Sequence, residues 1–179
     1  STPIRNTGTI AGNIVNASPI GDLTAFFLAL DSSLNIERRN SHSGITTRNV
    51  KLKEFYKGYK VIDMEDDEHI ASISFPILKK NSYFNFEKVS KRKYLDIASV
   101  NSAMSIKLEQ GKIKDIHISA GGVGPIPKYL SNTRDYLLNK ELNSEIIIGG
   151  LGIMQSEISP ISDARGSESY KRLLLRQLF

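Results

Sequence analysis

The stretch from Thr7 to Asp22 carries the residue types best suited to hold a polar ligand. Gly8, Gly12 and Gly21 let the backbone turn tightly, or approach a ligand without a Cβ in the way. Short polar side chains lie between these glycines: Thr9, Asn13, Asn16 and Ser18. Bare amides and hydroxyls beside a few apolar side chains suit a polar, flat, phosphate-bearing cofactor. The alternative is a Gly/Asn/Ser loop that only makes turns.

Lys88 is a second residue whose position could serve chemistry. It follows Phe84 and Phe86 at a spacing of two, so a strand over residues 83–89 places all three on one face. A lysine on an inward face needs an anion or a hydrogen-bond acceptor, because unpaired burial of its charge is expensive. The alternative is a lysine whose stem covers the core while its ammonium group reaches water.

Other catalytic and metal-binding patterns are missing from the sequence. His42, His69 and His117 lie in different predicted elements without ligand-type spacing, so we expect no metal site. The P-loop, the dinucleotide-binding glycine pattern and a spaced Ser–His–acid set are absent. The glycine run from Gly121 to Gly124 is interpreted as a structural turn, with contact to a ligand as the alternative.

Composition narrows the class of protein. With 179 residues, 40% of them hydrophobic, the chain can bury one or two modest cores. Cysteine is absent, which excludes disulfides, thiolate metal sites and an iron–sulfur cluster held by cysteines of this chain. No apolar run is long enough to span a membrane, and the N-terminal residues lack an apolar signal region. We therefore expect a cytoplasmic protein without membrane insertion.

The formal net charge of +5 is moderate, and the basic residues are scattered. Such a distribution is a weak argument for nucleic-acid binding, so we expect no nucleic-acid partner. A basic face that meets an acidic partner or an anionic cofactor is equally consistent with this charge.

Hydrophobic periodicity predicts an α+β protein, with Asp22 as the N-cap of a buried helix. The predicted helices span residues 23–30, 132–140 (with Thr133 available as a cap) and 167–179. The predicted strands span residues 33–39, 45–52, 69–77, 83–89, 97–109 and 112–120, with a hairpin at Gln110 and Gly111 joining the last two. Residues 54–60 are expected to form a short turn or helix. A polar link near 78–82 divides the chain into two units, 1–80 and 81–179.

Two segments carry conflicting signals. Residues 141–157 contain Ile146, Ile147 and Ile148, which favour a strand, while their apolar positions also recur at a helical spacing of four. We predict a helix there, although each of its glycines opposes a helix by roughly 1 kcal/mol.

At the start of the sequence, a glycine-rich loop begins within a few residues of Ser1. Compact domains seldom open on such a loop, so we expect the natural beginning to lie upstream.

The order of these residues resembles a known family. Thr9–Ile14 (Thr-Ile-Ala-Gly-Asn-Ile) and Asn16–Asp22 (Asn-Ala-Ser-Pro-Ile-Gly-Asp) are similar to the second half of the FAD-binding domain in xanthine dehydrogenase flavin subunits. The same pattern runs through the wider molybdenum hydroxylase group, including the carbon monoxide dehydrogenase medium subunit. Ala11 stands where that group usually has the first of two glycines. Further similar segments follow in the family's order: Phe86–Arg92, Asp96–Asn101, Gly121–Pro127 and Ser159–Ser167.

This resemblance implies the fold. It implies the second lobe of a PCMH-type FAD-binding domain, an antiparallel sheet with helices, over residues 1–80. It also implies a carbon monoxide dehydrogenase flavoprotein C-terminal-like α+β domain over residues 81–179. In the family a separate N-terminal lobe holds the FAD pyrophosphate, and this sequence shows no counterpart of it.

The resemblance also assigns roles to residues. The positions that it places against FAD are Thr9, Ile10, Ala11, Gly12, Asn13, Asp22, Ile70 and Lys88. It places Tyr59 and Asp96 at the electron-acceptor site. We further expect Lys88, with the amides around Gly12 and Asn13, to favour negative charge on the reduced flavin.

The implied function is that of an FAD-binding electron-transfer component of a xanthine dehydrogenase-like enzyme, inactive as an isolated piece. Electrons would pass from iron–sulfur clusters through FAD to NAD+ or another acceptor. Molybdopterin and the clusters would belong to partner chains or domains. One alternative is a non-catalytic module that docks partner subunits and lacks half of the FAD site. Another is an unrelated small-molecule binder that uses the same glycine-rich segment.

Overall fold

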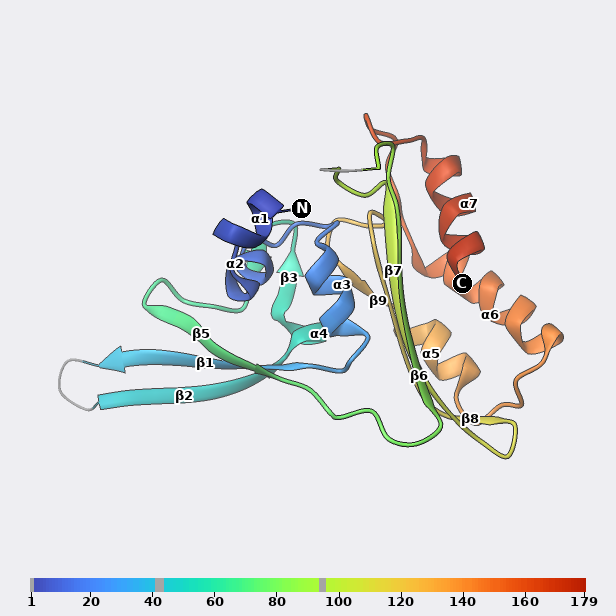
Figure 1. The fold of residues 1–179 in the computed structure, drawn as a ribbon, viewed down its shortest axis with the longest axis horizontal. Coiled ribbons are helices and arrows are strands. Elements are labelled where there is room, and N and C mark those ends of the chain that lie inside the picture. The colour runs from blue at the N-terminus through green and yellow to red at the C-terminus, as the bar shows by residue number, and fades with distance from the viewer. Residues whose placement is uncertain (1, 41–43, 94–95) are drawn as a thin grey trace.

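The computed structural model describes residues 2–40, 44–93 and 96–179, so His42 lies outside the described residues. The chain is α+β, as the sequence predicted, with antiparallel sheets and helices. Figure 1 shows an elongated molecule: a sheet projects as an arm on one side, and a second long sheet carries helices on the other.

The arm is a three-stranded antiparallel sheet in the order β2-β1-β5. Its strands are β1 (Ser33–Asn40), β2 (Gly44–Lys51) and β5 (Glu68–Ser74). Alternation along β1 buries Leu34 and Ile36 in the first core, because successive side chains of a strand face opposite sides. Across the strands, the Arg48 guanidinium donates to Glu68, which with the Glu65 backbone N–H holds the pKa of Glu68 at about 2.

Short elements close the first core beside the arm. They are α1 (Thr2–Thr7), α2 (Ile10–Val15), α3 (Asp22–Leu28), α4 (Leu52–Phe55), β3 (Tyr56–Gly58) and β4 (Val61–Ile62). Tyr56 fixes two of these helices, because its Oη bonds to Ile14 O at 3.1 Å and to Thr24 Oγ1 at 3.2 Å. Burial raises the pKa of Tyr56 to about 12, so the phenol keeps its proton.

The second sheet has the strand order β6-β7-β8-β9 and is antiparallel throughout. Its strands are β6 (Ser82–Val89), β7 (Val100–Glu109), β8 (Lys112–Gly121) and β9 (Lys128–Tyr129). The predicted hairpin is confirmed: Gln110 and Gly111 both have positive φ, the backbone geometry that suits a two-residue turn.

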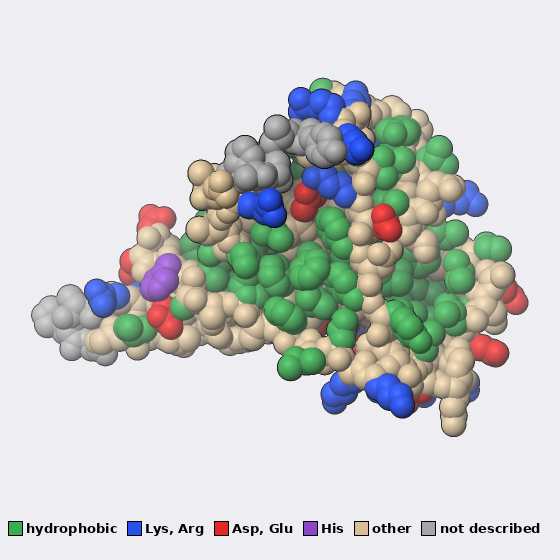
Figure 2. Space-filling model, viewed as in Figure 1, with side chains coloured by type: hydrophobic (Ala, Val, Ile, Leu, Met, Phe, Trp, Pro, Cys, Tyr) green, Lys and Arg blue, Asp and Glu red, His purple; other side chains and the backbone are tan. Residues whose placement is uncertain are grey.

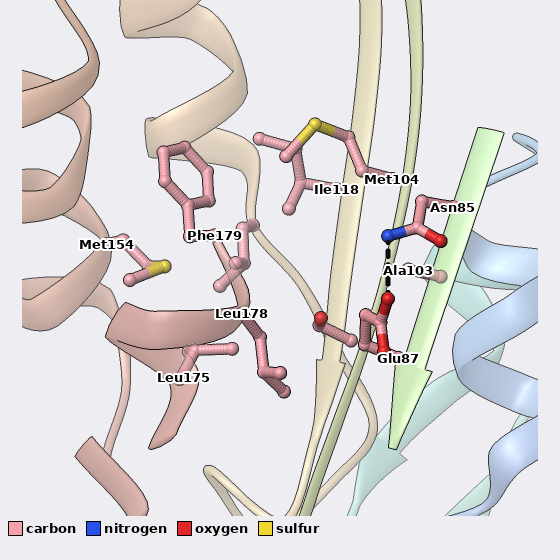
Figure 3. A pocket seen from close by; sticks show the side chains of 11 residues that line it. Asn85, Glu87, Ala103, Met104, Ile118, Met154, Leu175, Leu178 and Phe179 are labelled. Carbon is pink, nitrogen blue, oxygen red and sulfur yellow. Dashed lines mark hydrogen bonds between the residues drawn. The ribbon is translucent and has the colours of Figure 1, made fainter. Parts of the chain in front are cut away.

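Three helices cover one face of this sheet (Figure 1): α5 (Ser131–Leu137), α6 (Ser144–Glu157) and α7 (Glu168–Leu178). Their apolar sides form the second core with β7 and β8. A small cavity of 120 Å³ remains between the sheet and α6 and α7. Figure 3 shows it bordered by Met154 and Phe179 on the helix side, and by Asn85, which donates to Glu87 at 3.1 Å, on the strand side.

The helix α3 joins the two sheets. Ser105 Oγ of β7 donates to Ala29 O at 2.7 Å, and Ser119 Oγ of β8 donates to Ala25 O at 2.5 Å. Ala25 and Ala29 are fully buried, and their small side chains let the strands approach the helix backbone. This junction positions the start of α3, where Asp22 lies.

The glycine-rich start is helical, and the prediction of a loop was wrong. The helix α1 precedes it, and Thr9 is the N-cap of α2, where its Oγ1 accepts from Gly12 N at 2.9 Å. The glycines and short polar residues had suggested a loop, but the Thr9 hydroxyl caps the helix and stabilises its first turn. Asp22 is not a cap either: Gly21 holds that position, and Asp22 is the first residue of α3.

The remaining predicted elements differ mainly at their ends. The predicted helix over 141–157 is confirmed as α6, with Asn143 Oδ1 capping Ile146 N at 3.0 Å. Thr133 lies inside α5 and does not cap it; the Glu157 carboxylate accepts from Thr133 N at 3.0 Å instead. The segment 54–60 divides between the end of α4 and β3.

Two glycines allow a matched test of packing. A Cβ on Gly152 in α6 would meet nothing within 4 Å, so Gly152→Ala should raise the free energy of unfolding by about 1 kcal/mol. A Cβ on Gly121 would lie 2.3 Å from Asn101 Oδ1 and 3.2 Å from Ile20 Cα, so Gly121→Ala should lower it by about 1–3 kcal/mol. Urea unfolding followed by circular dichroism measures both. Equal effects of the two substitutions would contradict this account of the packing.

Candidate functional site

The ion pair of Lys88 and Asp22 joins β6 to α3. Lys88 Nζ donates to Asp22 Oδ2 at 2.6 Å, and the two side chains are 30% and 38% exposed. The Phe84 ring of β6 also meets the Phe26 ring of α3, with centroids 4.9 Å apart. Lys88 and Phe84 therefore share a face of β6, as the alternation predicted. The positive charge of Lys88 is paired with the Asp22 carboxylate. The Lys88 side chain is still partly exposed, so a ligand can reach it.

Asn101 of β7 holds the other oxygen of the same carboxylate. Its Nδ2 donates to Asp22 Oδ1 at 2.7 Å and to Ile20 O at 3.2 Å. Asn101 is completely buried. The carboxylate of Asp22 is thus fixed from both sides, by an amide from β7 and by an ammonium group from β6.

The segment Thr9–Asn13 forms the first turn of α2. Asn13 N donates to Thr9 O at 3.1 Å, and Gly12 N is taken by the Thr9 hydroxyl. The amides of Gly12 and Asn13 are therefore bonded within the chain. Their effect on negative charge at a reduced flavin stays a prediction. Among the described residues, Asn13 Oδ1 is buried and accepts no hydrogen bond. It lies 3.4 Å from where a Cβ of Gly21 would be.

An apolar shelf adjoins the ion pair. We define the aromatic shelf as four ring side chains in successive contact: Phe84, Phe26, Phe27 and Phe75. Neighbouring ring centroids are 4.9 to 5.8 Å apart, and Phe75 is 48% exposed. Figure 2 shows one face of the molecule, with hydrophobic side chains gathered in its middle. Phe27 is buried in the first core at 8% exposure, so a flat, partly apolar ligand can cover the accessible parts of the other three rings.

A cleft of 760 Å³ opens between the N-terminal elements and the C-terminal ones. Its lining comes from four stretches: Ser18, Pro19 and Ile20; Tyr59 and Lys60; Gly122, Gly124 and Pro125; and Ser159, Ile161, Asp163, Arg165 and Lys171. Three side chains in this lining are cationic and one is anionic, so the cleft favours an anionic ligand. Two glycines of the run 121–124 therefore line a cleft, in addition to making a turn.

A buried lysine organises the C-terminal wall of this cleft. Lys171 is 2% exposed, and its Nζ donates to Ile161 O at 2.8 Å and pairs with Asp163 Oδ2 at 2.9 Å. Burial raises the pKa of Asp163, but the hydrogen bonds from Lys171 and from Arg165 N outweigh it, so the pKa lies below 3.8. Asp163 is therefore ionised at neutral pH.

One short segment connects the cleft to the ion pair. Ser18, Pro19 and Ile20 line the cleft, and Asp22 follows two residues later. The segment is fixed to the second sheet, because Gly122 N donates to Pro19 O at 2.9 Å and Asn101 donates to Ile20 O.

The structure brings some of the predicted residues together and leaves others apart. Asp22 and Lys88 are in contact, and Tyr59 lines the cleft, where it is 64% exposed. Ile70 lies on β5 opposite Ile36 and packs against the first core. Asp96 accepts hydrogen bonds from Arg92 N and the Arg92 guanidinium, which lower its pKa, and it is not among the residues that line the cleft.

The remaining predicted residues belong to α2. Thr9 caps this helix; Ile10, Ala11, Gly12 and Asn13 occupy its first turn. Sequence reasoning missed Asn101, Lys60, Arg165 and Lys171. Asn101 and Arg165 belong to segments that carried the resemblance, but the sequence gives no signal that the first would touch Asp22 or that the second would line a cleft.

The groups around the Lys88–Asp22 pair fit a flavin. A flat ring system with carbonyl groups can meet the aromatic shelf with its face and the Lys88 ammonium with an oxygen. The buried Asn13 Oδ1 offers an unused acceptor nearby. Among the described residues, no group of three or more His, Cys, Asp or Glu side chains is arranged to hold a metal ion.

Comparison with known proteins agrees with these features. Residues 1–78 match the family described as the FAD binding domain in molybdopterin dehydrogenase, and residues 85–179 match the CO dehydrogenase flavoprotein C-terminal domain. The glyceraldehyde dehydrogenase medium chain of Sulfolobus acidocaldarius is 33% identical over 98% of this chain and 60% of its own length. Xanthine dehydrogenase 1 of Arabidopsis thaliana is 33% identical over 99% of this chain and 13% of its own length.

Solved structures show the same fold. A chain of the carbon monoxide dehydrogenase from Hydrogenophaga pseudoflava superposes with a TM-score of 0.90, at 25% identity, over 99% of this chain and 60% of that one. A chain of reconstituted CO dehydrogenase from Oligotropha carboxidovorans gives a TM-score of 0.86 at 23% identity, over 99% of this chain and 61% of that one.

The fold and the site thus define a flavin-binding protein of the molybdopterin dehydrogenase type. The chain belongs to the CO dehydrogenase flavoprotein family and carries an FAD-binding domain. It spans about 60% of the medium-chain relative that it matches and 13% of xanthine dehydrogenase 1. In the part of the chain that the structure describes, no helix is both long and apolar enough to cross a membrane.

The buried Lys171–Asp163 pair predicts a pH-dependent loss of stability. Asp163→Asn leaves Lys171 without its counter-charge, so the free energy of unfolding at pH 7 should fall by about 2 kcal/mol. Folding lowers the pKa of Asp163, so its contribution is complete above the unfolded value of 3.8 and is lost as pH falls through the folded value.

Urea unfolding of both proteins from pH 7 down to pH 2.5 measures this difference. The two unfolding curves should converge at the acid end, where Asp163 is protonated in both states. A difference in stability that stays constant over the whole range would contradict the assigned ion pair.

Proposed function

We propose that this chain forms one wall of the FAD site in an electron-transfer component of a xanthine dehydrogenase-like molybdenum hydroxylase. The observation that carries the proposal is the Lys88–Asp22 ion pair at the end of the aromatic shelf, in a chain whose residues 1–78 match an FAD-binding family. When bound, FAD supplies redox chemistry between an electron donor and an acceptor. The chain's own residues position the cofactor and set the charge around it.

Each group at this wall has a distinct part. Lys88 places a positive charge where a flavin oxygen would lie and so stabilises negative charge that develops on reduction. Asp22 orients the ammonium group through the 2.6 Å contact. The aromatic shelf covers the ring and excludes water from one side. The first turn of α2, from Thr9 to Asn13, and Ile70 are proposed to border the cofactor further out.

The rest of the FAD site is proposed to come from a lobe outside this chain. This chain aligns with only 60% of the Sulfolobus acidocaldarius medium chain, so that relative has residues outside the aligned region. We place molybdopterin and the iron–sulfur clusters on partner chains or domains of a cytoplasmic oxidoreductase. The proposed units of this chain are a second FAD lobe at 1–80 and the flavoprotein C-terminal domain at 81–179.

The 760 Å³ cleft is proposed to take the electron acceptor. Its cationic groups Lys60 and Arg165 suit the phosphates of NAD+ or another anionic acceptor, and the exposed ring of Tyr59 can stack on a base. Its position across the segment from the Lys88–Asp22 pair would bring acceptor and flavin close together. Asp96, in the loop between β6 and β7, is proposed to act at the edge of this site.

A docking module is the second candidate. The run from Phe75 to Leu78 joins the two sheets and is largely exposed, with Ile77 at 88%. Exposed apolar residues in one short stretch are typical of a surface that another protein covers. A chain that binds partner subunits but no flavin would support this candidate over the first.

Lys88 allows a direct test of the FAD wall. In the complete flavin subunit, Lys88→Ala should raise the dissociation constant for FAD about tenfold, because a charge-assisted hydrogen bond to the cofactor is lost. Lys107→Ala is the matched control: Lys107 also lies in the second sheet, and it pairs with Glu109. Fluorescence titration with FAD measures both. Equal affinities in the two variants would exclude the role given to Lys88.

Arg165 tests the acceptor cleft. Its side chain is 40% exposed, so Arg165→Gln should weaken NADH binding roughly tenfold without unfolding the protein. Added salt should reduce the difference from wild type, since exposed charges are screened. Arg176→Gln, on the exposed side of α7, is the control. NADH binding that is lost equally in both variants, or in neither, would place the acceptor elsewhere.

A further inference from the structure

We infer that Asn101 is the positioning residue that holds Asp22, and through it Lys88, in the geometry required at the flavin wall. This inference rests on the proposed FAD site and deepens it. Asn101 lies on β7, whereas Asp22 begins α3 and Lys88 lies on β6. One amide from the inner strand β7 thus determines how a carboxylate on a helix meets an ammonium group on the edge strand β6.

The contacts of Asn101 are directional. Both of its bonds use Nδ2: one runs to Asp22 Oδ1 at 2.7 Å and the other to Ile20 O at 3.2 Å. An amide nitrogen carries two N–H groups, so this donor capacity is fully used. The orientation of the amide is therefore set by two acceptors two residues apart, and the Asp22 carboxylate turns its second oxygen toward Lys88.

The burial of Asn101 argues against a role in packing alone. Its side chain is fully buried, and among the described residues Asn101 Oδ1 accepts no hydrogen bond. Leaving a buried acceptor unpaired costs roughly 1–3 kcal/mol, so an apolar residue of similar size would pack there at lower cost. An asparagine is nevertheless present, and it supplies hydrogen-bond donors to the Asp22 carboxylate and to Ile20 O.

The surrounding backbone is shaped to admit this side chain. A Cβ on Gly121 would lie 2.3 Å from Asn101 Oδ1, so only glycine leaves room for the amide. Gly122 has a φ of +80° and bonds to Pro19 O, which keeps the segment 18–22 against the sheet. The two glycines and Asn101 form one arrangement that fixes the segment between the cleft and the ion pair.

The chain itself offers a matched control. Ser105 lies on the same strand, is also buried, and also bonds to the α3 region, through Ala29 O at 2.7 Å. Ser105→Ala removes one hydrogen bond between β7 and the first unit, and Asn101→Leu removes two, to Asp22 and to Ile20 O. Only Asn101→Leu removes a bond to Asp22, so only this variant should disturb Lys88.

The test follows the Lys88 ammonium group in the flavin-free chain by ¹⁵N NMR. Asn101→Leu should raise the hydrogen-exchange rate of Lys88 Nζ about tenfold, since loss of a charge-assisted bond to Asp22 loosens the ion pair. Ser105→Ala should leave that rate close to wild type. If Asn101→Leu and Ser105→Ala lower stability alike and leave the Lys88 rate unchanged, Asn101 has only a packing role and the inference is overturned.

A second variant keeps the test decisive if Asn101→Leu does not fold. Asn101→Ala removes the same amide and leaves a smaller side chain that the site can accommodate. This variant should also raise the exchange rate of Lys88 Nζ above the wild-type rate, because it lacks the donor to Asp22. A rate that stays at the wild-type value in a folded Asn101→Ala variant would overturn the inference.

FAD affinity, measured in the complete flavin subunit, separates this inference from the proposed function. If the wild-type subunit binds FAD, Asn101→Leu should weaken binding about as much as Lys88→Ala, and the double variant should lose little more. If the wild-type subunit binds no FAD, the proposed function fails, while the exchange rate of Lys88 still decides the role of Asn101. Additive losses in the double variant would show that Asn101 acts independently of Lys88.

Discussion

The contact between α3 and the second sheet is the constraint on which the rest of the structure depends. Ala25 and Ala29 lie one helical turn apart and are fully buried, so the strands β7 and β8 come close enough for Ser119 and Ser105 to bond to the helix backbone. A larger side chain at either alanine would separate the layers. Because this contact fixes the axis of α3, it also fixes where the helix begins and which way Asp22 points. The Lys88–Asp22 pair, the buried amide of Asn101 and the cleft all follow from that placement.

This arrangement connects the two proposed binding surfaces through a single segment. Residues 18–22 face the cleft with Ser18, Pro19 and Ile20, and they lead directly to the carboxylate that meets Lys88. A protein that moves electrons between a bound cofactor and an exchangeable acceptor needs such proximity, with each ligand held by its own groups. The cationic lining of the cleft and the apolar character of the shelf suit two different ligands, which agrees with the proposed electron-transfer role.

Much of the architecture could be predicted from the sequence, since it depends on local pattern. Alternation predicted the strands around Leu34, Phe84 and Ile116, and the Gln110-Gly111 turn predicted the hairpin. The start of the chain was mispredicted because a cap at Thr9 and a helix are compatible with the glycine-rich composition that suggested a loop. For the site, the family resemblance singled out Asp22 and Lys88, which are in contact. Asn101 and Lys171 could not be found, because their roles arise from long-range contacts that no spacing in the sequence encodes.

The central claim is that FAD meets the wall formed by Lys88, Asp22 and the aromatic shelf. The most direct measurement is a titration of the ¹⁵N-labelled complete flavin subunit with FAD, followed by NMR. The account predicts that resonances of Lys88, Asn13, Phe26 and Phe84 shift together along one binding curve, while those of Lys107 and Arg48 stay in place. Shifts confined to the far end of the arm or to α6 would contradict the account. Lys88 resonances that do not shift at any FAD concentration would also contradict it.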